Sequence, residues 1–285
     1  MRPSWLVALF LALLGLAPLV LSEFAITLAN YIGLYSLVAL GLVLLTGVGG
    51  LTSFGQAAFV GLGAYTTAVL TTHALPASLA WLGSSPWFTL VAGLLITLAV
   101  AATLGSLTLK LSGHYLPLGT IAWGISLYFL FGTSETLGGH TGLTGVAPIE
   151  VFGVALESGR QIFYLIWFFL MAAVFTTLNL LDSREGRAIR ALKGGMVMAE
   201  SMGVNTSSSR MIAFVLAAMM ACASGWLYAH MQRFVNPTPF SLHAGIEFLF
   251  MAVVGGAGYV WGAIVGAGVI TVLKQWLQDW LPSIL

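Results

Sequence analysis

Charged side chains are scarce in this sequence, and their scarcity decides its class. Only 7% of the 285 residues are Asp, Glu, Lys or Arg, against about 25% in an ordinary soluble domain. No charged residue occurs between Glu23 and Lys110, and further charge-free windows span 161–181, 211–232 and 248–273. Each window is close to or longer than the roughly 20 apolar residues that one bilayer crossing requires. The sequence therefore excludes a soluble domain and predicts an all-α, polytopic integral membrane protein.

The sequence also lacks the motifs typical of metal binding, ATP hydrolysis and hydrolase catalysis. The single cysteine, Cys222, cannot form an intrachain disulfide and disfavours a thiolate metal site. His114 and His230 lack the spacing of metal-binding histidines. No G-x-x-x-x-G-K-[ST] segment is present for ATP hydrolysis, and no G-x-S-x-G segment supports an intramembrane hydrolase. We therefore expect no metal, no bound cofactor and no catalytic site in this chain, so that any ATP is used by partner subunits.

Apolar segments divided by glycine, proline and polar residues predict the helices. The first segment resembles a signal peptide, but no small-residue cleavage site follows Val20, which favours a retained helix. Helices are expected to break or re-enter at two glycine-rich stretches, Gly47–Gly63 and Gly255–Gly268. Residues 78–87 and 133–160 are expected to be loops at the membrane surface. We place nine helices in one domain over residues 1–285, with eight or ten equally compatible: 5–21, 26–46, 50–70, 88–108, 114–132, 161–181, 211–231, 242–256 and 259–280.

The positions of the positive charges predict the orientation. Five of the ten Lys and Arg residues lie in one polar loop, 182–210: Arg184, Arg187, Arg190, Lys193 and Arg210. By the positive-inside rule this loop is cytoplasmic. Counting crossings back from it places Arg2 and Lys110 on the cytoplasmic side, and Glu23, Glu135, Glu150 and Glu157 outside.

The first half of the loop 182–210 has helical patterning. Arg187, Arg190 and Lys193 recur every three residues with apolar residues between them, which predicts a short amphipathic helix. A break follows at Gly194–Gly195.

The second half of the loop predicts another short helix, 196–202. It carries Ala199 and Glu200 and stops at Gly203, a usual residue just past a helix end. Two short helices on the cytoplasmic face have the form of a docking surface for another protein. A solvated connector would show the same charges, so both interpretations stay open on the pattern alone.

Four segments, in order along the chain, resemble the permeases of branched-chain amino-acid ABC transporters, and most of all their M-type subunit. The similarity covers roughly residues 30–273. The segments are LTGVGGLTSFGQAAFVGLGAY, HTGLTGVAP, GRAIRALKGGMVMAESMGVN and IEFLFMAVVGGAGYVWGAIVGA.

This resemblance implies partners and a location. Members of the family are multi-pass subunits of the bacterial inner membrane. Each pairs with a second, H-type permease, two cytoplasmic ABC ATPases and an external solute-binding protein. The segment AESMGVN is similar to the one by which the ATPase contacts the pore, so the candidate coupling residues are Arg187, Arg190, Ala199, Glu200 and Gly203.

Polar residues inside the membrane are the candidates for a solute pathway, because exposing them to lipid is costly. Besides Asn30, these are Ser53, Gln56, His114 and Glu247. Glu247 precedes a Gly-Gly break within an apolar segment. Two structural roles explain a carboxylate at this position slightly better than contact with solute. Glu247 could cap a broken helix, or it could pair with an arginine such as Arg233.

Spaced glycines favour close helix packing. Gly258, Gly262 and Gly266 recur every four residues, which would place them on one helix face. Packing within this chain is favoured over a subunit contact. The stretches that begin at Gly49–Gly50 and Gly255–Gly256 show the same order, paired glycines followed by a G-x-A-rich helix, which suggests an internal repeat.

The function predicted from these features is import of amino acids, branched-chain or otherwise apolar, by alternating access driven by partner ATPases. The sequence does not separate these substrates from urea, short amides or other small polar solutes. An ion-driven secondary transporter is a weaker alternative, because it would need more buried acids than Glu247.

Overall fold

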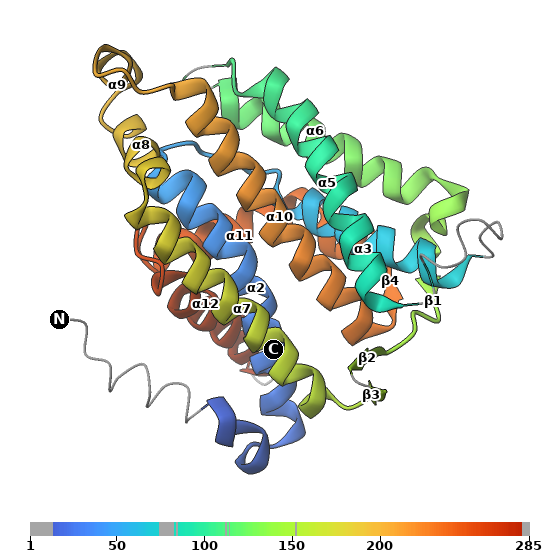
Figure 1. Ribbon diagram of the computed structural model, residues 1–285. Coiled ribbons are helices and arrows are strands. Elements are labelled where there is room, and N and C mark those ends of the chain that lie inside the picture. Colours follow the sequence, from blue (N-terminus) through green and yellow to red (C-terminus); the bar gives the residue numbers. More distant parts are fainter. Residues whose placement is uncertain are drawn as a thin grey trace.

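The computed structural model of the protein describes residues 14–73, 83, 85–111, 113, 115–151 and 153–280. Figure 1 shows a bundle of long helices, with two short helices at one end and short strands at the other. Among the described residues the helices are α2 (Glu23–Leu42), the π-helix η1 (Val43–Val48), α3 (Gln56–Thr72), α5 (Pro86–Thr108), α6 (Tyr115–Thr133), η2 (Glu135–Leu137), η3 (Gly139–Thr141), α7 (Gly159–Asp182), α8 (Arg184–Leu192), α9 (Met196–Ser201), α10 (Thr206–Gln232), η4 (Thr238–Phe240), α11 (Leu242–Val254) and α12 (Gly262–Trp280).

The predicted class, an all-α polytopic membrane protein, is confirmed. Five helical segments of the described chain are long and apolar enough to cross a bilayer: Glu23–Val48, Pro86–Thr108, Tyr115–Thr133, Gly159–Asp182 and Thr206–Gln232. Each predicted segment after the first contains a described helix. The predicted first helix, 5–21, lies largely outside the described residues, of which 14–20 are helical. The predicted loop 78–87 also lies mostly outside them.

Side-chain caps fix where several helices begin. The Ser22 hydroxyl accepts from the Ala25 N–H at the start of α2, and the Asn205 side chain accepts from the Ser208 N–H at the start of α10. Ser158 and Gln161 form a capping box at the start of α7. Each cap satisfies N–H groups that the first helical turn leaves unpaired.

The segment α2–η1 is the centre of the bundle. In its most apolar stretch 78% of the residues are buried, against 28% for α5. Helix α10 packs against α2, and a Cβ added at Gly41 would lie 3.0 Å from the Ala217 Cα. The α10 hydroxyl of Ser224 donates to the Leu34 carbonyl of α2 at 2.8 Å. Small residues thus allow the backbones to approach closely, as in other membrane bundles.

Two helix breaks interrupt the bundle where glycine pairs predicted them. The first break, residues 49–55, separates η1 from α3, and the second break, residues 255–261, separates α11 from α12. In each pair the second glycine has a left-handed backbone, with φ of 71° at Gly50 and 103° at Gly256. Because of the first break, α3 begins at Gln56 rather than at the predicted residue 50.

The expectation that three spaced glycines share one helix face is wrong for the first of them. Gly258 lies in the second break with φ 104°, before α12 begins at Gly262. Spacing of four residues implies a common face only where the helix is continuous. Gly262 and Gly266 do lie against α11: a Cβ on Gly262 would overlap the carbonyl of Gly255, and one on Gly266 would overlap that of Met251.

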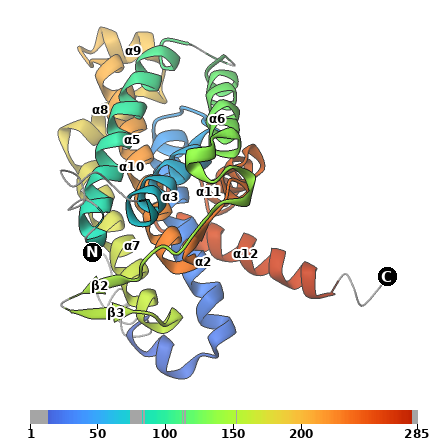
Figure 2. The ribbon, with the colours of Figure 1, turned by 90° about the vertical axis from the view of Figure 1, so that its right-hand side faces the viewer.

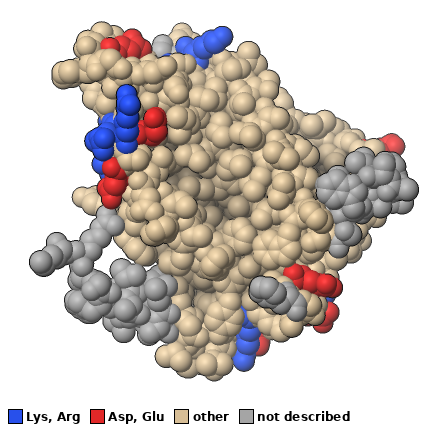
Figure 3. Space-filling view, viewed as in Figure 1, with Lys and Arg blue, Asp and Glu red and all other residues tan. Residues whose placement is uncertain are grey.

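The bundle has two distinct ends, which we call the loop end, with α8 and α9, and the hairpin end. At the hairpin end, β2 (Ile149–Val151) pairs antiparallel with β3 (Val154–Leu156), and nearby β1 (Leu143–Thr144) pairs with β4 (Phe234–Val235). Figure 2 shows the β2–β3 hairpin and α9 at opposite ends. On the face shown in Figure 3, charged side chains gather near these ends and leave a broad uncharged band between them.

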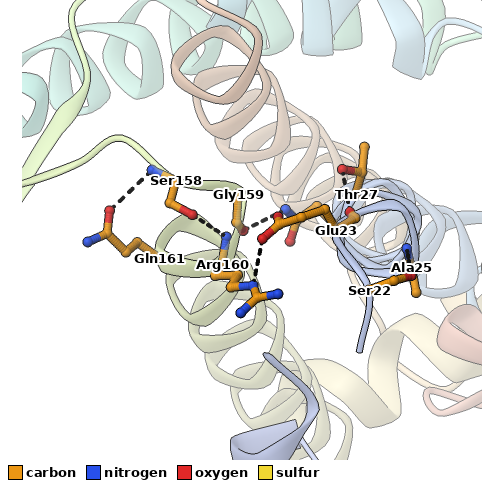
Figure 4. A network of polar contacts seen from close by, with 9 residues as sticks. Ser22, Glu23, Ala25, Thr27, Ser158, Gly159, Arg160 and Gln161 are labelled. Atoms are coloured by element: carbon orange, nitrogen blue, oxygen red, sulfur yellow. Dashed lines mark hydrogen bonds and ion pairs between the residues drawn. The ribbon is translucent and has the colours of Figure 1, made fainter. Parts of the chain in front are cut away.

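The start of α2 and the start of α7 are joined at the hairpin end (Figure 4). The Arg160 guanidinium lies 2.8 Å from the Glu23 carboxylate. The Asn30 amide donates to the Gly159 carbonyl at 2.9 Å. Asn30, a candidate pathway residue, therefore ties two helices together in this structure.

Candidate functional site

A cavity opens where α2, α10, α11 and α12 meet, and we call it the ion-pair cavity. It consists of two adjoining hollows of about 290 and 300 Å³. Leu28 near the start of α2 and Gln278 near the end of α12 both line it, which places the cavity in the hairpin-end half of α2. The two hollows share five lining residues: Tyr35, Tyr228, Pro239, Glu247 and Lys274.

The charged centre of this cavity is an ion pair between α11 and α12. The Lys274 ammonium lies 2.7 and 3.0 Å from the two carboxylate oxygens of Glu247. The His243 Nε2 lies 3.2 Å from the same carboxylate, one turn earlier on α11. The Glu247 side chain is 23% exposed and that of Lys274 is 52% exposed, so both charges are accessible from the cavity.

The sequence suggested an arginine such as Arg233 as the partner of Glu247, and the structure corrects this to Lys274. The reason is the tight turn of the second break, which folds α12 back along α11 and brings Lys274 opposite Glu247. Arg233 instead caps the C-terminus of α10 with a left-handed backbone, φ 54°. Its carbonyl accepts from the Gly145 N–H beside β1.

The other candidate pathway residues lie elsewhere. Ser53 and Gln56 are 2% and 1% exposed and line neither hollow of the ion-pair cavity. Their polar side-chain atoms have no hydrogen-bond partner among the described residues. Next to them, the Phe54 N–H donates to the Thr120 hydroxyl of α6 at 3.2 Å. His114 lies outside the described residues.

At the loop end, α8 lies with one face on the bundle. Ile189 and Leu192 are buried, whereas Arg187 and Arg190 are exposed. The predicted amphipathic helix is therefore present, and its arginines face away from the packed side. The Arg187 guanidinium donates to the Asp182 carbonyl at 3.2 Å, across the junction of α7 and α8.

The short helix α9 is anchored at two points. The Ala199 side chain is buried, and the Glu200 carboxylate accepts from the Thr206 hydroxyl at 2.6 Å, which ties α9 to the first residue of α10. Gly203 ends α9 with φ 77°, and its N–H donates to the Glu200 carbonyl. That left-handed geometry favours glycine.

The loop end presents both a groove and exposed apolar side chains. The groove, about 450 Å³, is lined by Arg184 and Arg187 of α8 and by residues 202–205 after α9, among others. The side chains of Val197, Met198 and Met202 are largely exposed beside it. An apolar patch rimmed by charge is typical of a surface that binds another protein.

Lys193, a residue that the sequence indicated only as part of the charge bias, joins this loop to the membrane helices. Its ammonium donates to the Gly47 carbonyl in η1 at 3.1 Å. A π-helical segment such as η1 is rare and frequently marks a functional position. Gly47 in turn packs against the second break, because a Cβ there would lie 3.1 Å from the Ala257 carbonyl carbon. Loop, first break and second break therefore form one chain of contacts.

Among the described residues no group of three or more His, Cys, Asp or Glu side chains is placed to hold a metal ion. The features that remain are a polar cavity toward the hairpin end, an exposed groove with apolar side chains at the loop end, and two helix breaks, the first of which lies against Lys193. Helices that break inside a bundle are typical of transporters.

Comparison with known proteins gives one consistent result. Residues 24–284 match the family described as the permease component of branched-chain amino acid transport systems. The chain is 28% identical to the high-affinity branched-chain amino acid transport system permease protein LivM of Salmonella typhimurium, over 92% of this chain and 65% of that protein. It is 29% identical to LivM of Escherichia coli, over 94% and 68% of the two chains.

H-type permeases also match. The chain is 26% identical to the permease protein LivH of Salmonella typhimurium, over 87% of this chain and 83% of that protein. The chain thus spans about two thirds of the length of the LivM proteins and a larger share of LivH. No solved structure matches it.

Proposed function

This chain belongs to the permease-component family of branched-chain amino acid transport systems, and from that premise we propose that it forms one half of the pore of an ATP-driven amino-acid importer in the bacterial inner membrane. The observation that carries the proposal is the family match, which covers both the membrane helices and the loop 182–210. The substrates are branched-chain amino acids, which the names of its relatives state for those proteins, or other apolar amino acids. The chain itself binds no cofactor and hydrolyses no ATP.

The loop end faces the cytoplasm in this proposal. Four basic residues of α8 and its C-cap lie there, Arg184, Arg187, Arg190 and Lys193. Lys110 is at the same end, because the Arg210 guanidinium donates to the adjacent Leu109 carbonyl at 2.7 Å. By the positive-inside rule an end with this excess of basic residues stays in the cytoplasm. The ion-pair cavity then lies toward the outside, where a solute-binding protein delivers substrate.

In this proposal the movement of the ATPases reaches the chain at the groove between α8 and the junction of α9 and α10. Two partner ATPases close when they bind ATP, and one of them moves the loop 182–210 through the exposed patch of Val197, Met198 and Met202. Lys193 transmits this movement to Gly47 in η1, just before the first break, and the Gly47 contact with Ala257 carries it to the second break. The helices around the two breaks then alternate between an outward-open and an inward-open packing. Each packing is stabilised by a different state of the ATPases.

A second, H-type permease completes the pore. Both M-type and H-type relatives match this chain, which is what two related pore halves would show. Figure 2 shows α12 projecting from the bundle, and its side chains Val265, Val269, Val272 and Trp276 are exposed. This apolar face is the proposed contact with the second permease.

The alternative substrates, urea and short amides, fit a neutral pore, but they lack groups to pair with the charges of Glu247 and Lys274. The ion-driven carrier is also less well supported. Such a carrier needs an acid that gains and loses a proton or binds a cation, whereas Glu247 is paired with a lysine. ATP-driven amino-acid import therefore remains the preferred function.

Uptake in proteoliposomes tests this function. The chain alone should not move leucine across the membrane. Co-assembly with an H-type permease, two ATPases and a binding protein should give leucine uptake that requires ATP and that a protonophore does not abolish. Uptake of leucine by the chain alone, driven by a proton gradient, would replace the proposal with a secondary transporter.

Orientation is tested separately by thiol labelling in a Cys222→Ser background. A cysteine placed at residue 190 should react only from the cytoplasmic side. A cysteine placed at residue 150 should react only from the outside. Reaction of residue 190 with a membrane-impermeant reagent in intact cells would reverse the topology.

A further inference from the structure

We propose that Glu247 and Lys274 form a head-group site for a zwitterionic α-amino acid within the ion-pair cavity. The inference deepens the proposed function and rests on it. It assigns to the pore a binding site for both charged groups of the substrate, so that discrimination is not left to the external binding protein alone.

The first argument is that the pair faces the cavity. Charged side chains within membrane helices face a cavity, a partner or one another, because exposing them to lipid is costly. Helix α11 is a short apolar helix, and Glu247 is the one acidic residue along it. Lys274 is half exposed and the nearby His243 is 83% exposed. These polar groups therefore face the cavity rather than the packed interior of the bundle.

The second argument is charge complementarity. An α-amino acid carries an ammonium and a carboxylate on one carbon, and the pair offers a carboxylate and an ammonium 2.7 Å apart. When the zwitterion inserts, its ammonium takes the place of Lys274 on Glu247, and its carboxylate takes the place of Glu247 on Lys274. Neither protein charge loses its partner, so the exchange leaves no charge unpaired. The flexible stem of lysine allows the ammonium to swing aside.

The third argument concerns the walls of the cavity. Leu34, Val60 and Phe248 line the same hollow as the ion pair and provide an apolar surface for a hydrocarbon side chain. The aromatic rings of Tyr35 and Phe248 lie 5.5 Å apart, centre to centre. At about 290 Å³ the hollow is smaller than the roughly 300–1,000 Å³ of drug-sized pockets. Its chemistry fits a small solute with one charged end and one apolar end.

Charge reversal separates substrate binding from a purely structural ion pair. Glu247→Gln and Lys274→Gln should each lower ATP-driven leucine uptake at least tenfold, with normal assembly and ATPase activity. The double variant Glu247→Lys/Lys274→Glu keeps an ion pair but reverses its direction, and it should stay as impaired as the single variants. Recovery of uptake in the double variant would overturn the binding site and leave a structural pair. Glu23→Gln, which breaks the exposed pair with Arg160, is the matched control and should transport normally.

A binding measurement makes the test independent of transport. In a Cys222→Ser background, a cysteine at Ser241, which lines the hollow, should react with a small thiol reagent in the assembled complex. Leucine should slow the reaction, whereas 4-methylpentanoate and isopentylamine, each with only one of the two charges, should slow it at least tenfold less. Equal protection by all three compounds, or none by leucine, would overturn the site.

The outcomes distinguish the site from the proposed function. Failure of the unmodified complex to import any amino acid overturns the function, and this site with it. Normal leucine import by the unmodified complex and by both single variants overturns the site alone.

Discussion

The two helix breaks are alike in backbone and different in surroundings. Each separates two helices and contains a glycine pair whose second member is left-handed. The first break is the more enclosed, because Gly49, Ser53 and Gly55 within it are buried, and Lys193 holds the Gly47 carbonyl just before it. The second break is open, with largely exposed side chains at Val254 and Tyr259.

This difference suggests a division of labour. A lysine makes the polar contact in each region: Lys193 of the loop reaches the Gly47 carbonyl just before the first break, whereas Lys274, well along α12, reaches the carboxylate of Glu247 across the cavity. The first break therefore lies against the loop end, whereas the second break joins the two helices that carry the ion pair of the cavity. Because Gly47 packs on Ala257, a change in one break requires the other to adjust.

The largest effect is expected from adding a side chain where α12 packs closely against α11 next to the second break. Gly266→Val places a side chain where the Met251 carbonyl and the Gly255 N–H already lie. Overpacking typically lowers the stability of the folded protein by about 1–3 kcal/mol. In this variant the added side chain meets backbone atoms, which cannot move aside, so we expect a loss near or above the upper end of that range. We expect loss of monodisperse protein after extraction, measured by size-exclusion chromatography.

Gly268→Val is the matched control for Gly266→Val. It lies two residues further along α12, and a Cβ there would meet only the Ile32 side chain, at 4.0 Å. This variant should extract like the unmodified protein. Equal loss in both variants would show that α12 tolerates no added bulk, and that the packing of the second break is not the cause.

The next largest effect is expected at the loop end, where motion would enter the first break. Gly203→Pro removes the N–H that donates to the Glu200 carbonyl and cannot adopt φ 77°. Glu200→Arg removes the bond to Thr206 that anchors α9. Both variants should remain in the membrane while ATP-driven uptake is lost and ATPase activity no longer responds to substrate. Normal uptake in both would remove the loop from the mechanism.

A smaller effect is expected from removing only the hydrogen bond between Lys193 and the helix end that precedes the first break. Lys193→Met keeps the length of the stem and removes the hydrogen bond to the Gly47 carbonyl. A hydrogen bond with a charged donor contributes about 1.5–3 kcal/mol, so coupled uptake should fall by about tenfold. Lys110→Met is the control at the same end, since Lys110 is exposed and makes no hydrogen bond among the described residues. Equal uptake in the two variants would show that Lys193 transmits nothing.

The positions of the membrane-crossing helices could be predicted from the sequence, because hydropathy alone determines them. Long apolar windows such as 88–108 and 161–181 match α5 and α7 within two residues at each end, because a bilayer crossing demands both length and apolarity. The glycine pairs correctly located the breaks. What they could not supply was the conformation of Gly258, since equal spacing is compatible with a continuous helix or with an interrupted one.

The site was less predictable because its contacts join residues far apart in the chain. Lys193 and Gly47 are 146 residues apart, and a backbone carbonyl leaves no signature in the sequence. Glu247 was recognised from its apolar neighbours, but its partner Lys274 lies 27 residues away across a turn whose direction the sequence does not fix. The helix end at Gly203 was predicted correctly, because glycine just past a helix is a local signal; its role in coupling stays a prediction.

The smallest effect is expected from a neutral hydrogen bond inside the first break. The Thr46 hydroxyl donates to the Leu51 carbonyl at 3.0 Å and so closes the turn that follows η1. Thr46→Val keeps the shape and removes the donor, and a bond of this kind contributes about 0.5–1.5 kcal/mol. Backbone amides of residues 47–52 should exchange hydrogen several-fold faster, while uptake changes by less than threefold. Thr103→Val, which removes an ordinary hydroxyl bond to the Ala99 carbonyl on the exposed face of α5, should leave those amides unchanged. If the two variants exchange alike at residues 47–52, the first break is held by packing and by Lys193, and its turn adds no rigidity of its own.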